Sequence, residues 1–378
     1  MSIFFFKFPL VASLGGAEFH TLKLAQHFHA QGRQIKLITS DQHLFRLFEK
    51  HGLPRQRTFL GWEPTSKWSL LLWPLTFLIA KIKLKNIVAA APADSIFFCQ
   101  SLTEKLIFPG LLIKPNTYNL KPVFIEHKIP GRWLKLNPLK FLYLYYARRV
   151  TIIAVSGFVK NEFIKLGVPE KNIQVIYPAV HNPPQPSASK RERVPPLKLR
   201  GGEGELFTIG ILSRLDPEKG VLGFLTSLLP YLPNHPNWKI LIAGEGRQKQ
   251  EIQQFIWQNH LQNHIELLGF IYNTAEFFSK ISVLVQPSRN PEAFGLTVLE
   301  AMSHVIPVIA ARIGALPEII THGIDGFLVS SVNNGWIEYL TELENPATCE
   351  KISAAALHTA QSFSETKMFE AFDQLLPN

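Results

Sequence analysis

Residues 281–302 read ISVLVQPSRNPEAFGLTVLEAM, and they indicate the fold most clearly. Residues 283–286 form a short apolar run, which is typical of a strand buried on both faces of a sheet. A loop with two prolines follows, and Gly295 then begins a helical pattern. A buried strand that passes through a short loop into a helix is the repeating unit of a parallel α/β sheet, so the sequence predicts this fold class.

The same alternation continues along the chain of 378 residues. A helix is predicted at residues 17–31, and further strands at 3–8, 34–39, 95–99, 122–126, 151–155, 207–212, 240–243, 264–268 and 307–310. The pattern breaks at residues 181–205, where five prolines, three glycines and mixed charge show no period. We therefore expect two α/β domains at 1–182 and 206–355, a linker at 183–205, and a C-terminal helix at 356–378 able to pack back on the first domain.

The charge is divided unevenly between the two halves. The chain has 39 Lys and Arg against 29 Asp and Glu, a net +10. Residues 1–182 hold 24 basic and 9 acidic residues, a net +15, whereas residues 183–378 hold 15 and 20, a net −5. A basic half suits nucleic acid, an anionic membrane surface or a polyanionic substrate. The apolar fraction of 46% excludes a disordered chain.

Targeting signals are weak. The apolar start at residues 1–10 carries Lys7 and lacks a basic leader, so a first strand is favoured over a signal peptide. The apolar stretch at 68–80 is shorter than the roughly 20 residues that span a bilayer, so no transmembrane helix is expected. Two cysteines, Cys99 and Cys349, exclude a disulfide framework and fit a reducing compartment.

Three sequence features follow predicted strands, where open α/β sheets bind ligands. Residues 213–220, SRLDPEKG, present Arg214 and Lys219, a pair suited to a diphosphate. Glu292 and Glu300 lie eight residues apart, on either side of a helix start whose backbone N–H groups favour anions. His127 follows the strand at 122–126 and suits hydroxyl positioning or proton transfer. Solvated loop charges and a structural histidine are the alternatives.

A glycine pair separates the first strand from the first helix. Gly15 and Gly16 would let a ligand approach the backbone at a helix N-terminus. A tight turn without a ligand explains the pair equally well. The dinucleotide fingerprint GxGxxG is absent here, so nothing supports a nicotinamide site.

Together these motifs resemble the retaining GT-B glycosyltransferases of group 1, family 4. Glu292 to Glu300 reproduces the E-x7-E motif within PEAFGLTVLEAM. Supporting matches occur in order at residues 15–18 (GGAE), 154–180, 213–220, 241–246 (LIAGEG), 266–271 (ELLGFI) and 306–329. The sequence departs from the family at His304 and Val305, which replace a run of small residues rich in Ala and Gly.

The resemblance implies two Rossmann-like domains with the active site between them, the first for the acceptor and the second for a nucleoside-diphosphate sugar. Arg214 and Lys219 would then neutralise the diphosphate and Glu300 bind the ribose hydroxyls. Glu292 would contact the donor sugar and His127 the reacting sugar, and these two are the candidate catalytic residues. The other implied contacts are the backbone at Phe294, Gly295, Leu296 and Thr297 for sugar and phosphate, Phe270 and Ile271 for the base, and Gly15 and Gly16 for the diphosphate or acceptor.

The reaction so implied is sugar transfer to a hydroxyl of a glycan or lipid-linked acceptor with retention, in cell-envelope glycan synthesis. The nucleotide sugar is a co-substrate, so no cofactor is expected, and no Asp-x-Asp triplet occurs, so no metal is expected. The implied location is cytoplasmic, with peripheral attachment at the inner face of the membrane as a refinement. A sugar-nucleotide epimerase and a non-catalytic carbohydrate-binding protein of the same fold remain alternatives. No nucleic-acid-binding motif is present, so that partner is not expected.

Two basic, apolar stretches lie in the first half. Residues 67–86, KWSLLLWPLTFLIAKIKLKN, and 136–149, LNPLKFLYLYYARR, combine aromatic and leucine residues with Lys and Arg. We expect their apolar residues to be buried against the sheet and their basic residues to lie on the surface. Attachment to an anionic membrane is the alternative.

Overall fold

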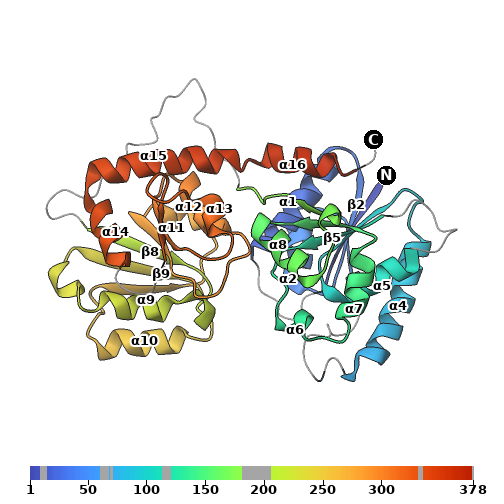
Figure 1. The fold of residues 1–378 in the computed structure, drawn as a ribbon, viewed down its shortest axis with the longest axis horizontal. Helices are drawn as coiled ribbons and strands as arrows, with labels where there is room; N and C mark the ends of the chain where they lie inside the picture. The colour runs from blue at the N-terminus through green and yellow to red at the C-terminus, as the bar shows by residue number, and fades with distance from the viewer. Residues whose placement is uncertain are drawn as a thin grey trace. The chain divides into compact units, whose positions relative to one another are not determined.

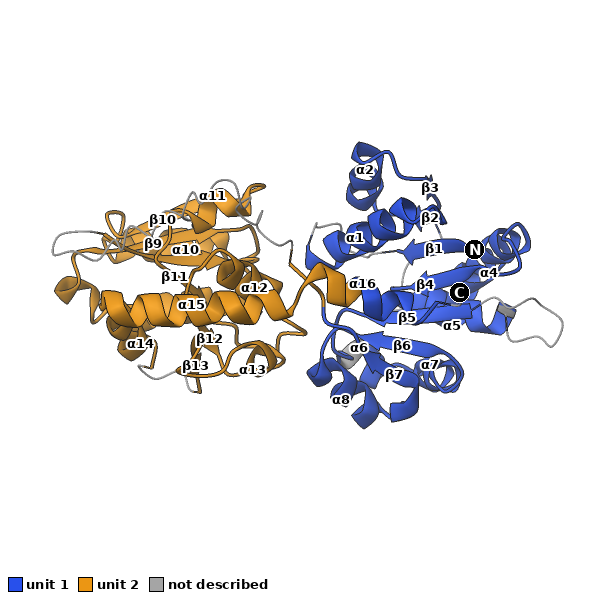
Figure 2. Cartoon of the chain, turned by 90° about the horizontal axis from the view of Figure 1, so that it is seen from above, with its two compact units in different colours: residues 1–177, 369–378 blue, residues 178–368 orange. Residues whose placement is uncertain are grey.

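The computed structural model describes residues 1–8, 15–59, 68, 71–112, 121–180, 206–330 and 335–376. The chain forms two compact units, Met1–Tyr177 with Phe369–Asn378, and Pro178–Met368 (Figure 2). The expected linker at 183–205 lies outside the described residues. Each unit holds one parallel sheet with helices against it, which confirms the predicted α/β class (Figure 1).

The first unit is built on a seven-stranded sheet in the order β3-β2-β1-β4-β5-β6-β7. Its strands are β1 (Ser2–Lys7), β2 (Gln34–Thr39), β3 (Arg55–Arg57), β4 (Ile96–Cys99), β5 (Lys121–Glu126), β6 (Thr151–Ala154) and β7 (Ile173–Val175). Its described helices include α1 (Gly16–Ala30), α2 (Gln42–Lys50), α4 (Trp73–Ala89), α5 (Leu102–Leu112), α6 (Arg132–Lys135), α7 (Lys140–Ala147) and α8 (Gly157–Leu166).

Aromatic side chains fill the centre of this sheet. Phe5 of β1 is fully buried and stacks on Phe98 of β4 at 5.3 Å between ring centroids. Phe28 of α1 stacks on the same Phe98 ring at 6.2 Å. The end of the chain joins this core, because Phe372 packs edge-on against Phe98 at 6.0 Å. Burial on both faces explains why β1 reads as an almost continuous apolar run.

The second unit is built on a six-stranded sheet in the order β10-β9-β8-β11-β12-β13. Its strands are β8 (Phe207–Leu212), β9 (Trp238–Ala243), β10 (Ile265–Gly269), β11 (Val283–Gln286), β12 (Val308–Ala311) and β13 (Phe327–Val329). Its helices include α9 (Val221–Leu228), α10 (Lys249–Gln258), α11 (Thr274–Phe278), α12 (Leu296–Ser303), α13 (Leu316–Ile319), α14 (Gly335–Glu344), α15 (Pro346–Ser362) and the start of α16 (Glu365–Asp373).

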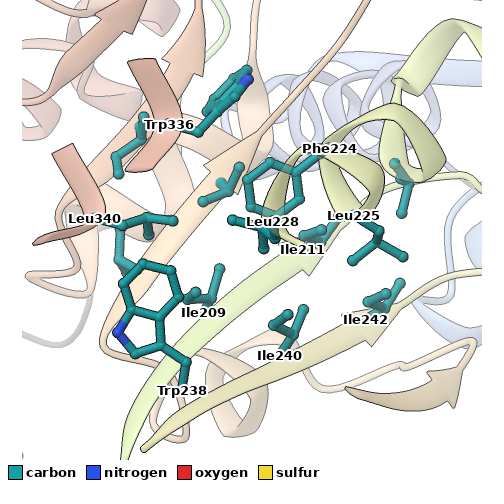
Figure 3. Close-up of a cluster of buried hydrophobic side chains, with 14 of the residues drawn as sticks. Ile209, Ile211, Phe224, Leu225, Leu228, Trp238, Ile240, Ile242, Trp336 and Leu340 are labelled. Carbon is teal, nitrogen blue, oxygen red and sulfur yellow. The ribbon is translucent and has the colours of Figure 1, made fainter. Parts of the chain in front are cut away.

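Figure 3 shows part of the core of this unit. Ile209 and Ile211 of β8 pack among side chains from β9, α9 and α14, and both are fully buried. The side chain of Trp238 is buried, and its indole N–H donates to Glu344 Oε1 at 2.8 Å. The core therefore keeps its buried polar group satisfied, as a stable interior requires.

Both sheets reverse their order at one point. The chain lays down β1, β2 and β3 to one side and then places β4 on the other side of β1. It does the same with β8, β9 and β10 before β11. Loops at the carboxyl ends of β1 and β4, and of β8 and β11, therefore leave the sheet in opposite directions, and such switch points are where open α/β sheets bind ligands.

The expected burial of the apolar residues in the stretch at 67–86 holds for only one face of the helix. Within α4, Trp73, Thr76 and Ala80 are buried, but large apolar side chains on the other side of the helix face solvent. The exposed large apolar side chains of this stretch are Trp68, Leu71, Leu72, Leu75, Leu78, Ile79 and Ile82. Apolar residues surround the helix, so the sequence carries no periodicity that would separate its buried face from its exposed face. No described helix is long and apolar enough to cross a membrane.

His304 and Val305, where the sequence departs from the family, form the C-terminal cap of helix α12. Ile306 N–H donates to Ala301 O and Val305 N–H to Met302 O, each at 3.0 Å, which is the Schellman pattern at a helix C-terminus. The motif places Val305 in the left-handed region, with φ +63°. Glycine normally occupies this position because a β-branched side chain is strained there.

Val305→Gly is expected to raise the free energy of unfolding by about 1 kcal/mol, because it removes this strain. Val305→Asn, which tolerates the left-handed region, should also stabilise, whereas Val305→Ile keeps the β-branch and should not. Chemical denaturation of the three variants measures the effect. Destabilisation by both Gly and Asn would contradict the assignment.

Candidate functional site

The loops after β8 and β11 are held together at the switch point of the second unit. The backbone N–H groups of Arg289 and Asn290 donate to Glu218 O at 2.9 and 3.2 Å. Gly220 has φ +70°, and a Cβ there would stand 2.0 Å from Pro287 O. Only glycine permits this approach, so the loop carrying Lys219 lies directly against the loop carrying Glu292.

The structure brings Lys219 and Glu292 together. Lys219 Nζ lies 2.7 Å from Glu292 Oε1, and the two side chains are only 19% and 17% exposed. The same oxygen accepts from Gln286 Nε2 at 3.1 Å and from the hydroxyl of Ser288. The carboxylate is thus held in one orientation by three donors, which come from the loop after β8, from the end of β11 and from the loop that follows β11.

These contacts set the protonation state of Glu292. Burial works to raise its pKa, but the Lys219 charge and the hydrogen bonds from Lys219, Ser288 and Gln286 outweigh burial and hold the pKa below its usual value. Glu292 is therefore ionised at neutral pH. Lys219 in turn has one carboxylate neighbour in the described part of the chain, at a place where a second anion would compete for it.

Arg214 sits in a network of opposite charges. It forms ion pairs with Asp216 and, at 3.4 Å, with Glu218, and Arg247 pairs with the same two carboxylates at 3.0 and 3.3 Å. Burial alone would raise the pKa of Asp216, but the Arg247 hydrogen bonds and the charges of both arginines hold it below its usual value. The Arg214 side chain remains 57% exposed, so one face of its guanidinium is accessible.

The helix start predicted at Gly295 is present. Helix α12 begins at Leu296, and the amides of Gly295, Leu296 and Thr297 lie where helix geometry supplies no intrahelical acceptor. The Phe294 side chain is buried against Phe363. Glu300 lies further along α12 and is partly buried.

The predicted base-binding turn follows β10. Phe270 is half-exposed and Ile271 partly buried. Tyr272, which the sequence did not single out, is almost fully exposed, and its ring meets Phe270 edge-on at 4.8 Å. Two accessible aromatic rings at the carboxyl end of a strand suit stacking on a planar base.

In the first unit, a carboxylate occupies the helix start at the glycine pair. Gly15 N–H donates to Glu18 Oε2 at 2.9 Å, and Lys7 Nζ lies 2.7 Å from Glu18 Oε1. Burial lowers the pKa of Lys7, although the Glu18 charge opposes the shift. The amide of Gly15 is therefore already satisfied by the protein, while Gly16 lies beside it as the first residue of α1.

His127 lies at the carboxyl end of β5, next to a second histidine that the sequence did not single out. The ring of His20 meets that of His127 edge-on at 5.1 Å. Among the described residues, neither ring nitrogen of His20 nor Nε2 of His127 has a hydrogen-bond partner. Burial lowers the pKa of His20 to about 3, with help from Lys7 and Lys23. Burial also holds the pKa of His127 well below its usual value, with contributions from His20 and Lys7.

Five side chains at the candidate site were not predicted from sequence: His20, Tyr272, Gln286, Ser288 and Arg247. Ser288 and Gln286 lie inside the stretch quoted at the outset, but only folding shows that they converge on Glu292. Arg247 follows LIAGEG, and nothing in its sequence context links it to Asp216. No group of three or more His, Cys, Asp or Glu side chains among the described residues is placed to hold a metal ion.

A hollow of about 730 Å³ lies in the first unit. It is lined by the starts of β1 and β2 and by α4, including Ile3, Lys36 and Asn86. The first residues of β1 and β2 line it, whereas His127 and the glycine pair lie beyond the carboxyl ends of β5 and β1. The hollow is therefore separate from the candidate site.

The buried histidines predict how stability depends on pH. Both are neutral in the folded chain, whereas in the unfolded chain each takes up a proton near pH 6.5. The free energy of unfolding should therefore fall as the pH drops below about 6.5, by up to about 1.4 kcal/mol per pH unit for each histidine. His20→Phe is expected to reduce this slope in denaturation curves measured from pH 7 to 5. His43→Phe, at an exposed position, serves as the control; an unchanged slope in His20→Phe would contradict the argument.

Two family models match the chain in succession. Residues 14–182 match "Glycosyltransferase Family 4" and residues 200–358 match "Glycosyl transferases group 1". The uncharacterized glycosyltransferase MJ1178 of Methanocaldococcus jannaschii is 26% identical over 347 residues, which are 88% of this chain and 85% of that protein. An exopolysaccharide phosphotransferase of Streptomyces coelicolor is 37% identical over 123 residues, but the match covers 32% of this chain and only 13% of that protein.

A solved structure shares the architecture of the whole chain. HepE of Anabaena in complex with UDP-glucose superposes with a TM-score of 0.78 at 21% identity, covering 100% of this chain and 99% of HepE. At that identity the similarity concerns the fold. The shared architecture, together with the two family matches, places this chain among the GT-B glycosyltransferases.

Proposed function

We propose that the chain transfers a sugar from a nucleoside-diphosphate sugar to a hydroxyl of a glycan or lipid-linked acceptor, with retention of anomeric configuration. The observation that supports this best is the Lys219–Glu292 ion pair at the switch point between β8 and β11. It joins a cation suited to a diphosphate with a carboxylate suited to sugar hydroxyls, and the start of α12 follows in the same loop.

A uridine diphosphate sugar is the donor we propose first. HepE, which shares the fold, was crystallised with UDP-glucose. In this chain the accessible rings of Phe270 and Tyr272 are available to stack on a base, and Glu300 is assigned to the ribose hydroxyls.

The proposed catalysis rests on placed charge. As the bond from the anomeric carbon to the diphosphate breaks, negative charge grows on the leaving oxygen. Lys219 and the accessible face of Arg214 are assigned to that charge, because fixed cations lower the barrier when they interact more strongly with the transition state than with the ground state. Their present carboxylate partners keep both side chains oriented before the donor binds.

Glu292 and His127 are assigned to the sugar. Glu292 is ionised and fixed, so it can accept hydrogen bonds from donor hydroxyls through the oxygen that Lys219 does not occupy. His127 is neutral, and its Nε2 has no partner among the described residues, so it remains available to a sugar hydroxyl. Gly16 and the amides of Leu296 and Thr297 are assigned to phosphate and sugar oxygens.

We place this activity in cell-envelope glycan synthesis, at the cytoplasmic face of the membrane. The basic surplus of residues 1–182 favours an anionic acceptor or membrane. The exposed apolar side of α4 favours a lipid-linked acceptor over a free sugar.

Donor binding is tested by thermal unfolding. UDP or UDP-glucose should raise the melting temperature, corresponding to about 2.7 kcal/mol at a hundredfold excess over Kd, and GDP or ADP should raise it less. Lys219→Ala and Arg214→Ala should each lose most of this shift. Lys280→Ala, which removes an exposed lysine whose ion-pair partner is the exposed Glu276, should retain it. Equal shifts in all variants would refute the diphosphate assignment.

Stereochemistry is tested on the product. Proton NMR of the glycoside formed from UDP-glucose should show the anomeric configuration of the donor, as retention requires. Inversion would contradict the proposed mechanism, and an epimerised nucleotide sugar without transfer would replace it with the epimerase alternative.

Glu292→Gln should slow transfer by about a hundredfold or more if the carboxylate stabilises the transition state.

A further inference from the structure

Helix α4 presents two apolar faces, and only one packs against the protein. Trp73, Thr76, Ala80 and Leu84 recur at helical spacing and are buried. The opposite side, which we call the outer face of α4, is between 42% and 71% exposed at each position. It consists of Leu71 and Leu72 just before the helix and of Leu75, Leu78, Ile79 and Ile82 within it. A continuous row of six large apolar side chains is unusual on a solvent surface and marks an interaction site.

Lysines border this outer face. At 100° per residue, Lys81 and Lys85 fall along one edge of the apolar row and Lys83 along the other. Lys83 is held in place, because its Nζ donates to Phe59 O at 2.7 Å. The sequence has no Asp or Glu between Glu63 and Asp94, so no acidic residue of this segment offsets these charges.

Exposed apolar side chains beside basic residues also occur near helix α7. α4 packs on α5, and α5 packs on α7, so the three lie in a row (Figures 1 and 2). Near α7, Leu136 and Phe141 are 81% and 78% exposed, and the Arg149 guanidinium lies 3.8 Å from the centroid of the Tyr145 ring. The second basic, apolar stretch of the sequence is thus also exposed in part.

A membrane surface fits this face better than a second copy of the chain. In a symmetric dimer the same patch meets itself, so the lysines of one copy would face those of the other without nearby carboxylates. An anionic bilayer neutralises them, and its headgroup region accommodates leucine and isoleucine side chains from a helix that lies in the interface plane. Lys81 and Lys85 would then lie at the level of the lipid phosphates and contact them.

We propose that the outer face of α4, with Lys81, Lys83 and Lys85 at its edges, docks the first unit onto an anionic lipid bilayer. The apolar row inserts at the boundary of headgroups and acyl chains, and the lysines contact lipid phosphates. That docking brings the enzyme to a lipid-linked acceptor rests on the proposed function; the docking itself does not.

Sedimentation of the full chain with vesicles tests the proposal. The protein should bind vesicles that contain phosphatidylglycerol and leave vesicles of phosphatidylcholine alone largely unbound, and added salt should weaken binding. The triple variant Leu75→Gln, Leu78→Gln, Ile82→Gln keeps helix-forming residues and should reduce binding by tenfold or more. Lys81→Gln with Lys85→Gln should also reduce it by about tenfold or more, since each lysine contributes to attraction by an anionic surface.

Matched controls are exposed residues of the second unit. Trp257→Gln removes an exposed aromatic ring, and Lys249→Gln with Lys280→Gln removes two exposed lysines; these variants should bind like the wild type. Equal binding to both vesicle types, or wild-type binding by the triple and double lysine variants, would overturn the proposal. If the triple variant fails to fold, the lysine variant and the salt dependence decide.

Two readouts separate this inference from neighbouring ideas. A wild-type dimer that becomes monomeric in the triple variant, without vesicle binding, would assign the face to a second copy and overturn the proposal. The UDP-dependent thermal shift should persist in the triple variant, because the substitutions lie outside the donor unit. Vesicle binding without any nucleotide-dependent shift would sustain the docking face while the proposed transferase activity failed.

Discussion

The strand order of each sheet reverses once, between β1 and β4 and between β8 and β11, and the polar chemistry of the molecule depends on this reversal. Parallel strands buried on both faces leave no room for polar side chains along their length. Polar groups gather where strands end, and at the reversal the chain connections leave on opposite sides of the sheet, which opens these strand ends to a ligand. Lys219 and Glu292 follow β8 and β11, and Lys7 ends β1. Each unit therefore has a largely buried ion pair beside the first strand of its sheet, Lys7 with Glu18 and Lys219 with Glu292.

Much of the fold could be predicted because strands that are buried on both faces appear in the sequence as continuous apolar runs. Strands such as Val283–Gln286 and Phe207–Leu212 were predicted with the bounds that the structure has, since continuous apolar runs announce them. The strands at Arg55–Arg57, Ile173–Val175 and Phe327–Val329 were missed because three residues are too few to show a period. The exposed side of α4 was missed for the opposite reason, because a helix apolar all around has no preferred face.

The candidate site could be located from sequence, but its connections could not. Loop position alone identified Arg214, Lys219 and Glu292. Their pairing depends on which loops touch. Residues in contact, such as Gly220 and Pro287, are dozens of positions apart in the sequence. Nothing in the sequence indicates His20, because it is one of thirteen histidines in the chain and lies within a helix without a distinguishing motif. The structure reveals it through a property that sequence does not carry, a buried ring with no hydrogen-bond partner among the described residues.

The interior of the first unit also explains where its positive charge must lie. Lys7 and Lys105 are buried, and each is matched by a carboxylate, Glu18 at 2.7 Å and Glu126 at 2.9 Å. A buried cation without such a partner would cost several kcal/mol, and among the described residues the interior adds no net positive charge. The surplus of +15 in residues 1–182 therefore belongs to the surface. There it is costly for self-association and favourable beside anionic lipid, and the lysine-bordered apolar face of α4 combines that charge with a surface that water solvates poorly.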